Sequence, residues 1–302
     1  MKKTIGALGI LLSINIFAVP NIGITQIIEH PSLDAVRSGF EKAIKDSNYR
    51  DTKIEYQNAQ GEFATAQLIS NKFVSDKKDV IVAISTPSAQ AAYNSTKEIP
   101  ILFSAVTDPA SAGFPTGKNI TGTSDLAPIE KQLSIAKEIL PKIKKVGMIY
   151  TTSEKNSEYL VELTKEIGKK LDLEIVSVGV TNLSELLSAT DSILKKSDVI
   201  YITTDNLVSA SIPMIIQKAN KKNIPIIGST KDHVLQGALI TETIDYEKLG
   251  YQTGIMATKI LNGENVETLP VETMKETDLI VNKAAAEKYK VDLSNLKNAQ
   301  II

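Results

Sequence analysis

The sequence predicts an α/β fold with two doubly wound, Rossmann-like parallel-sheet lobes joined by crossover strands. Apolar runs of strand length alternate with stretches of helical period, as in parallel sheets covered by helices on both faces. The alternation restarts after residue 141, so the chain has two halves of similar rhythm. At 302 residues the chain exceeds the length at which one hydrophobic core usually stops growing.

The first 18 residues have the pattern of a secretory signal peptide. Lys2 and Lys3 precede an uncharged apolar run from Ile5 to Ala18, a small residue at a possible cleavage point. An uncleaved anchor is the alternative, because the run approaches the length that spans a bilayer and Ile16 suits cleavage poorly. We expect an exported, periplasmic protein, or one anchored on the outer side of the cytoplasmic membrane.

The first lobe is expected to begin at residue 19. Strand-like and helix-like segments alternate in this order: 21–28, 32–47, 53–59, 62–76, 79–85, 88–97, and then two strands at 100–106 and 119–125. Each change from a continuous apolar run or a period of 2 to a period near 3.6 marks a strand followed by a helix. These segments form a first βαβ series.

A second series follows a helical segment at 128–141. Strands are expected at 145–151, 173–180, 198–204 and 224–229, and the helices between and after them at 157–171, 183–195, 209–222 and 231–237. The end breaks the rhythm with a strand-like segment at 237–246, a strong helix pattern at 247–263, two short strands at 269–274 and 278–282, and a last helix at 283–290. We expect lobe 1 to hold 19–125 and 246–277, and lobe 2 to hold 126–245 and 278–302.

Composition excludes several classes of site. The chain has no Cys, and therefore no disulfide, thiolate metal site or cysteine nucleophile. Only His30 and His233 are histidines, so a multi-histidine metal site is impossible and a Ser-His-Asp triad has no support. A net charge of -1, with scattered lysines, does not favour nucleic acid as a partner. We expect no catalytic residues, metal or cofactor.

Polar residues follow the apolar runs. Parallel strands deliver their carboxyl ends to one edge of a sheet, and ligands of open α/β folds bind beyond that edge. The candidates in lobe 1 are Thr25, Gln26, His30, Ser85, Thr86, Ser104, Thr107 and Asp108. Those in lobe 2 are Thr151, Thr152, Asn156, Thr203, Thr204, Asp205, Asn206 and the segment from Ser229 to Asp232.

This set favours binding over chemistry, because nearly all its members are neutral hydroxyls. Hydroxyls and the amides of helix N-termini suit a carboxylate, and Asp205 could accept a ligand ammonium. A zwitterionic amino acid fits both. The alternative for Ser85, Thr86 or Ser104 is a simple helix cap worth about 0.5 to 2 kcal/mol. Asp205 could likewise cap a helix that starts near residue 209, and His30 could be a turn residue.

Five segments carry a family resemblance. They are IGITQIIEHPSLDAVRSGF, AISTPSAQA, FSAVTDPASAG, YITTDNLVSA and GALITETIDYEKLGYQTGIMATKILNGE. In this order and at these spacings they resemble the ABC transporter substrate-binding proteins of the tryptophan/tyrosine-type group, which have the type I periplasmic-binding-protein fold. The likeness runs from about Ile22 to the end. The lipoprotein Cys usual in such proteins is missing.

The resemblance implies a two-lobed protein that closes on a small ligand and presents it to an ABC permease and its ATPase. By similarity, Ser85, Thr86, Ser104 and Thr107 would hold the ligand carboxylate, and Asp205 with Asn206 the ammonium. Thr25, Gln26 and His30 would meet the ligand side chain, and 229–232 would line lobe 2. Hinges are expected near 122–128, 240–246 and 270–280. We expect a monomer, because the closing cleft must stay accessible.

Other functions would use the same scaffold. A sensory module that signals to a membrane receptor is the main alternative, and a secreted enzyme is a further one, although two histidines leave few choices of base. A DNA-binding regulator would need a helix-turn-helix before the first strand, where the apolar signal lies.

Overall fold

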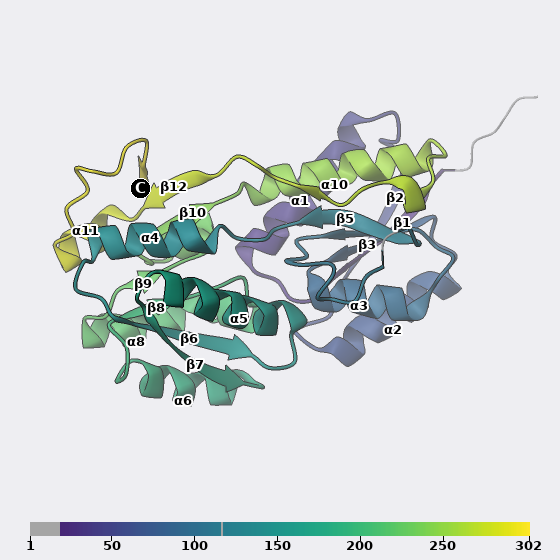
Figure 1. Cartoon of the computed structure of the whole chain (residues 1–302). Coiled ribbons are helices and arrows are strands. Elements are labelled where there is room, and N and C mark those ends of the chain that lie inside the picture. The colour runs from purple at the N-terminus through teal and green to yellow at the C-terminus, as the bar shows by residue number, and fades with distance from the viewer. Residues whose placement is uncertain (1–18, 116) are drawn as a thin grey trace, which may run out of the picture.

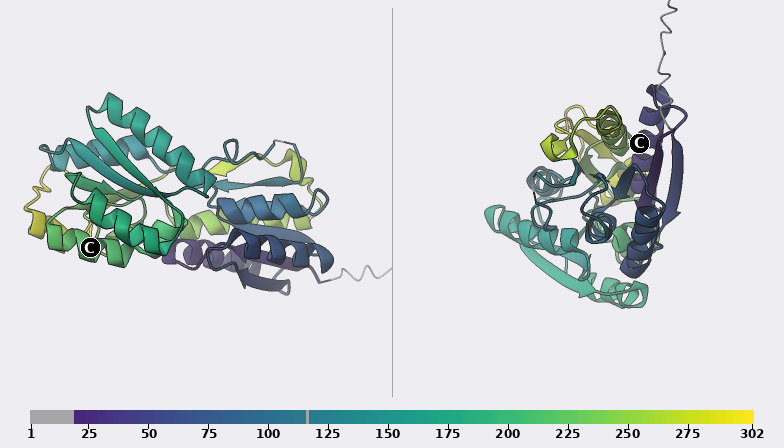
Figure 2. Two further views of the ribbon diagram at one scale, coloured as in Figure 1. Left: turned by 90° about the horizontal axis from the view of Figure 1, so that it is seen from below. Right: turned by 90° about the vertical axis from the view of Figure 1, so that its right-hand side faces the viewer.

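The structure is a computed structural model, and it describes residues 19–115 and 117–302. The signal peptide or anchor expected at 1–18 lies outside the described residues. Two lobes lie end to end along the long axis of the molecule, each with a sheet between layers of helices (Figures 1 and 2). The α/β fold with two doubly wound lobes is confirmed.

The sheet of lobe 1 has six parallel strands in the order β11-β5-β4-β3-β1-β2. The strands are β1 (Asn21–Gln26), β2 (Lys53–Asn58), β3 (Val80–Ile84), β4 (Ile101–Ser104), β5 (Ile120–Ser124) and β11 (Glu272–Thr273). Helices α1 (Pro31–Asp46) and α10 (Tyr246–Leu261) cover one face, and α2 (Phe63–Ser75) and α3 (Thr86–Ser95) the other (Figure 1). A short 3-10 helix, η1 (Val266–Thr268), follows α10.

The sheet of lobe 2 has seven strands in the order β13-β12-β10-β9-β8-β6-β7. They are β6 (Lys145–Thr151), β7 (Glu174–Val180), β8 (Val199–Tyr201), β9 (Ile226–Ile227), β10 (Ile240–Thr243), β12 (Asp278–Val281) and β13 (Gln300–Ile301). Here β12 runs antiparallel to β10, which departs from the predicted all-parallel arrangement. The reason is that β12 enters from lobe 1 by a direct crossing, without the helical connection that a parallel neighbour needs.

The helices of lobe 2 fall into two layers with separate apolar cores. The helices α4 (Ile129–Ile139), α5 (Lys155–Lys170) and α11 (Lys283–Tyr289) contribute to one core. The helices α6 (Leu183–Ile193), α7 (Asn206–Ala210) and α8 (Ile212–Lys222) form the other with the opposite face of the sheet. The short helix α9 (Lys231–Leu235) lies between β9 and β10 in the chain.

The pairing of α1 with α10 returns the late helix to lobe 1. A Cβ added at Gly39 would lie 1.9 Å from the carbonyl oxygen of Glu247, and one at Gly250 would lie 1.9 Å from that of Val36. Only glycine permits this backbone approach. The helix therefore covers the first sheet although it follows the second in sequence.

Three chain crossings join the lobes, between β5 and α4, β10 and α10, and β11 and β12. The chain passes from one lobe to the other at residues 125–128, 244–245 and 274–277. We propose that lobe 1 consists of residues 19–125 and 246–277, and lobe 2 of residues 126–245 and 278–302, as expected from the sequence.

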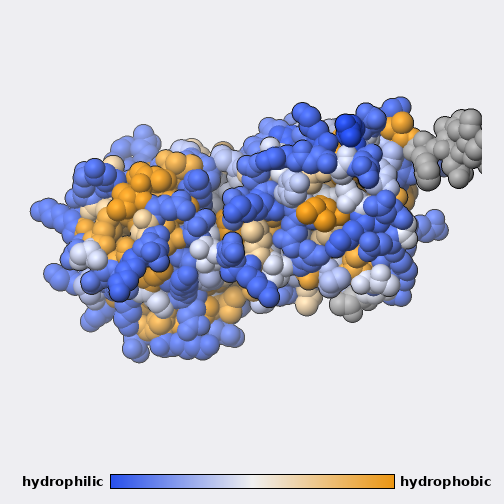
Figure 3. Space-filling view, turned by 90° about the horizontal axis from the view of Figure 1, so that it is seen from above, coloured by the Kyte–Doolittle hydropathy of each residue, from blue (hydrophilic) through white to orange (hydrophobic). Residues whose placement is uncertain are grey.

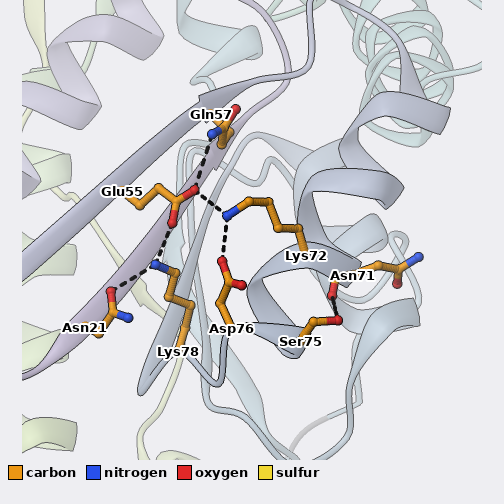
Figure 4. Close-up of polar contacts among 8 residues, drawn as sticks. All are labelled: Asn21, Glu55, Gln57, Asn71, Lys72, Ser75, Asp76 and Lys78. Carbon is orange, nitrogen blue, oxygen red and sulfur yellow. Dashed lines mark hydrogen bonds and ion pairs between the residues drawn. The ribbon is translucent and has the colours of Figure 1, made fainter.

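An ion-pair network lies near the amino ends of β1 and β3 (Figure 4). Lys78 is buried and donates to Asn21 Oδ1 at 2.9 Å and to Glu55 Oε2 at 2.7 Å. Lys72 donates to Glu55 Oε1 at 2.8 Å and to Asp76 Oδ2. Each charge of this amino-edge network has an opposite charge beside it.

The outer surface is hydrophilic over most of the face in Figure 3, and apolar residues gather at its lobe-2 end. The exposed Ile301 and Ile302 belong to that lobe. Among the helices of residues 19–115 and 117–302, none has both the length and the apolar character needed to cross a bilayer.

Candidate functional site

A small cavity, of about 10 Å³, lies between the lobes, where strands of both sheets deliver their carboxyl ends. Its lining residues come from the segments that follow seven strands and from the start of α10. Lobe 1 contributes His30, Ser32, Leu33, Ser85, Ala105, Thr107, Asp125 and Tyr246, and lobe 2 contributes Asn156, Thr204, Asn206, Ser209 and Thr230.

The two lobes touch across this cavity. Ser85 Oγ donates to Asn206 Oδ1 at 3.1 Å, and Asn206 also forms a side-chain hydrogen bond with His30. The hydroxyls of Thr107 and Thr204 are 3.5 Å apart. The conformation is therefore a closed one, with neutral polar contacts across the cavity.

Two residues with left-handed backbone stand side by side at the cavity. Ser85 has φ 78° and Ala105 has φ 56°, and they follow the paired strands β3 and β4. The Ser85 amide donates to the Ser104 carbonyl at 2.9 Å, which links the two strand ends. A residue with a side chain pays of the order of 1 kcal/mol or more in this region of backbone conformation. Strain of this kind is characteristic of ligand clamps.

Asp125 is the acid of the cavity. It follows β5, is 4% exposed, and accepts hydrogen bonds from Thr107 Oγ1 at 3.2 Å and from the Tyr246 hydroxyl at 3.0 Å. Burial raises the pKa of Asp125 to about 6, against the lowering effect of these bonds. No Lys or Arg is among the described residues that line the cavity. The charge of Asp125 therefore has no cation beside it.

His30 does not supply that cation. Burial lowers the pKa of His30 to about 4, although its bond to Asn206 acts in the opposite direction. The imidazole is neutral at neutral pH, so it offers one donor and one acceptor and no charge.

Glu154 lies behind the lobe-2 wall. Its Oε2 accepts from the side-chain amides of Asn156 at 3.1 Å and of Asn206, and from the Asn206 backbone amide at 3.3 Å. Burial, together with the nearby Asp205 carboxylate, raises the pKa of Glu154 to about 8. Glu154 holds a proton at neutral pH and orients two amides that line the cavity.

Asp205 faces its own lobe. Its carboxylate accepts from the Thr151 amide at 2.6 Å, the Thr151 hydroxyl at 2.9 Å, Ser157 Oγ at 2.7 Å and the Val208 amide at 2.9 Å. The last bond makes Asp205 the N-cap of α7. Four donors from lobe 2 occupy both oxygens, and Asp205 does not line the cavity. Asp205 is therefore a helix cap, which was the alternative to a ligand contact. The helix that it caps starts at Asn206 instead of near residue 209.

The other sequence candidates divide into two groups. The structure brings His30, Ser85, Thr107, Asn156 and Asn206 together at the cavity, with Thr204 and Thr230 from the wider set. It leaves Thr25, Gln26, Thr86, Ser104, Asp108, Thr151, Thr152, Thr203, Ser229 and Asp232 out of the lining.

Several residues of the second group have partners inside their own lobe. Ser104 Oγ lies 3.0 Å from the Thr123 hydroxyl and 2.8 Å from the Thr253 hydroxyl. Gln26 Nε2 donates to Asp34 Oδ1 at 2.9 Å, and Ser229 Oγ donates to the Ile202 carbonyl at 2.7 Å. Asp232 instead lines a neighbouring groove.

Sequence reasoning missed Asp125 and Glu154, and it did not single out Tyr246 among several aromatic residues that could enter the cleft. Asp125 carried a signal, because it ends the strand-like run 119–125 and the strand-end rule applies to it as to the others. Tyr246 reaches the cavity only because α10 returns to lobe 1. Glu154 acts through side-chain amides that the fold brings to it. Neither has a local signal.

Three comparisons bear on the fold and its family. The family described as ABC transporter substrate binding protein matches residues 21–299. A tyrosine-binding protein of Clostridioides difficile (strain R20291) is 48% identical over 288 residues, which cover 92% of this chain and 84% of that protein.

Two solved structures show the same architecture in different conformations. A complex with L-Trp from Streptococcus pneumonia has a TM-score of 0.91 at 29% identity, and covers 94% of this chain and 100% of that one. The ligand-free, open structure of a substrate binding protein with adhesive properties from Clostridium difficile has a TM-score of 0.71 at 44% identity, with 94% and 99% covered. The resemblance stated from the sequence and the type I periplasmic-binding-protein architecture are confirmed.

Proposed function

This chain belongs to the ABC transporter substrate binding protein family, and from that premise we propose that it closes its two lobes around an aromatic or apolar amino acid. In this role it is the extracytoplasmic solute-binding protein of an ABC importer. It hands the ligand to a permease that is driven by its ATPase. Binding and release need no covalent step.

The observation that carries the amino-acid proposal is the isolated charge of Asp125. A buried carboxylate with no cation beside it is destabilised, and a ligand ammonium removes that penalty with a charge-assisted hydrogen bond. Thr107, in the segment after β4, and Tyr246, at the start of α10, hold the carboxylate in place. We therefore assign the ammonium contact to Asp125 rather than to Asp205.

The ligand carboxylate needs donors without a second cation. The first turn of α3 begins at Thr86, directly after the strained Ser85, and the unpaired amides of a helix start carry partial positive charge. The Ser85 hydroxyl, which now donates to Asn206, can turn to the ligand instead. Lobe 1 alone then holds both charged ends of a zwitterion.

The chemical class of the side chain comes from the relatives. One relative is named for tyrosine binding, and one solved neighbour contains L-Trp. Leu33 and Ala105 give the lining an apolar part beside the neutral polar groups. An aromatic amino acid therefore suits both the relatives and the mixed polar and apolar character of the lining.

Closure follows from contacts that one ligand makes with both lobes. The chain resembles the L-Trp complex more than the open, ligand-free structure in TM-score, although its sequence identity to the open protein is higher. The open and closed forms would differ by rotation at the three crossings, and the ligand would select the closed one. We propose that the protein acts as a monomer in the periplasm, where the permease recognises the closed form.

The test is calorimetric titration of the chain lacking residues 1–18 with tyrosine, tryptophan, phenylalanine, leucine and a simple sugar. We expect binding of at least one aromatic amino acid. Asp125→Asn should weaken it by about 10- to 100-fold, because a charged hydrogen bond is lost while the shape is kept.

Asp232→Asn is the matched control, because it removes an acidic charge close to the cleft but outside the cavity lining. We expect it to leave the affinity within about threefold, since its carboxylate bonds only to Gln236 among the described side chains. Binding of the sugar alone would refute an amino-acid ligand. Equal losses in both variants would refute the assignment of Asp125.

A further inference from the structure

One buried acceptor at the cavity has no partner. Of the buried side-chain polar atoms that lack a hydrogen-bond partner in the described part of the chain, only Asn156 Oδ1 belongs to a cavity-lining residue. Asn156 is 3% exposed, and it is the second residue of α5. An unsatisfied buried carbonyl is costly, so its presence at a ligand cavity points to a donor that the ligand supplies.

The orientation of this amide is determined by its other end. Asn156 Nδ2 donates to Glu154 Oε2 at 3.1 Å and to the Thr204 carbonyl at 3.2 Å. The carbonyl of Thr204 can only accept, so the reverse orientation would place two carbonyl oxygens against each other. The acceptor Oδ1 is therefore the atom left for a ligand.

We propose that Asn156 Oδ1 accepts a hydrogen bond from the side chain of the bound amino acid, so that the protein selects aromatic side chains that carry a donor. This inference rests on the proposed function. The donor is a phenol O–H or an indole N–H, which share this chemistry, and phenylalanine has none. The binding partner of Asn156 is thus the part of the ligand that distinguishes the aromatic amino acids.

Charge matching separates this contact from the ammonium contact. The ammonium is a cation and pairs best with the carboxylate of Asp125, which lies in lobe 1. Asn156 is neutral and lies in lobe 2 at the start of α5. A ligand that satisfies both atoms bridges the lobes, so the same side-chain contact that gives selectivity also favours closure.

The size of the effect follows from leaving a buried acceptor unpaired. We expect tyrosine and tryptophan, or the one of them that fits, to bind about 10- to 100-fold more tightly than phenylalanine. In Asn156→Ala the acceptor is absent, so this ratio should fall to about threefold or less, and phenylalanine should lose less affinity than the donor-bearing ligands.

The experiment is calorimetric titration of the chain lacking residues 1–18, as wild type and as Asn156→Ala, with the three aromatic amino acids. Ser209→Ala is the matched control. Its hydroxyl also lines the lobe-2 wall but is engaged by His233 at 3.1 Å, so the ratio should stay as in the wild type. A wild-type protein that binds phenylalanine as tightly as the others would overturn the proposal. So would an equal loss for all three ligands in Asn156→Ala, which would assign Oδ1 to the ammonium or to structure alone.

A ligand series on the wild type keeps the proposal testable if Asn156→Ala does not fold. Among para-substituted phenylalanines, the amino form carries a donor and the fluoro form does not. The amino form should bind like tyrosine and the fluoro form like phenylalanine, and the reverse order would overturn the proposal. Failure of the proposed function is a different result, because no amino acid would then bind at all.

Discussion

The amino-edge network and the interlobe cavity both hold carboxylates in partly or fully buried positions, with opposite electrostatic results. At the amino edge, hydrogen bonds from Lys72 and Lys78 lower the pKa of Glu55 to about 2 (Figure 4). At the cavity, burial without a cation raises the pKa of Asp125 to about 6, and burial beside Asp205 raises that of Glu154 to about 8.

The difference separates structure from function. The amino-edge network supplies its own countercharges, so it stabilises the fold and offers nothing to a ligand. The cavity carries a carboxylate without a countercharge, that of Asp125, and an amide oxygen without a hydrogen-bond partner, that of Asn156. Both groups destabilise the fold, and a ligand that pairs with them removes this cost.

The largest effect is expected for Lys78→Met at the amino edge. Removal of a buried lysine leaves Glu55 with one cation instead of two, and breaking a buried pair from one side is strongly destabilising. We expect a loss of about 3 kcal/mol in the free energy of unfolding, measured by urea denaturation. Lys145→Met removes half of an exposed pair with Glu174 at 3.4 Å and should cost about 0.5 kcal/mol or less. Equal losses would contradict the contrast.

At the cavity wall, Glu154→Gln should change the pH dependence of stability. The folded pKa of about 8 lies above the ordinary value of 4.5, so ionisation of Glu154 destabilises the fold. This penalty is absent below pH 4.5, grows as the pH rises toward 8, and is complete above it. Gln cannot ionise, so the variant should gain at least about 2 kcal/mol relative to wild type between pH 5 and pH 9, because each unit of pKa difference corresponds to about 1.4 kcal/mol. Parallel stability curves would exclude this role.

Ligand affinity should depend on the protonation of Asp125. A ligand ammonium prefers the ionised carboxylate, so the affinity is full above the pKa of about 6 and falls below it by about tenfold for each pH unit, or about 1.4 kcal/mol. Titrations between pH 4.5 and 8 test this. Asp125→Asn should be weak and independent of pH over that range, and a wild-type affinity that does not change would oppose the assignment.

The smallest effect is expected at the exposed side of the amino-edge network. Asp76→Ala removes the partner of Lys72 one helical turn away and keeps Glu55 paired with both lysines. We expect a loss of about 0.5 kcal/mol that disappears in high salt, since exposed pairs are weak and screened. A loss that persists in high salt would show that the network acts as a unit.

Sequence patterns were sufficient for the fold because they are local. Apolar runs and helical periods predicted nearly every strand and helix, and the strand-end rule placed Ser85, Thr107 and Asn206 at the cavity. The rule could not tell which way a side chain turns once its strand has ended. Ser104 and Asp205 therefore appeared as suitable for ligand contact as their neighbours. In the structure, hydroxyls and amides of their own lobes form hydrogen bonds with them instead.

The two-lobed architecture, the family and the edge of each sheet where the cavity lies can be read from the sequence, since they depend on periodicity and on residues close in the chain. Which carboxylate meets the cavity and which amide lacks a partner follow only from the folded arrangement. Those outcomes depend on contacts between residues far apart in sequence, such as Tyr246 with Asp125 and Glu154 with Asn206. Burial and countercharge exist only once both lobes and the returning helix α10 are in place.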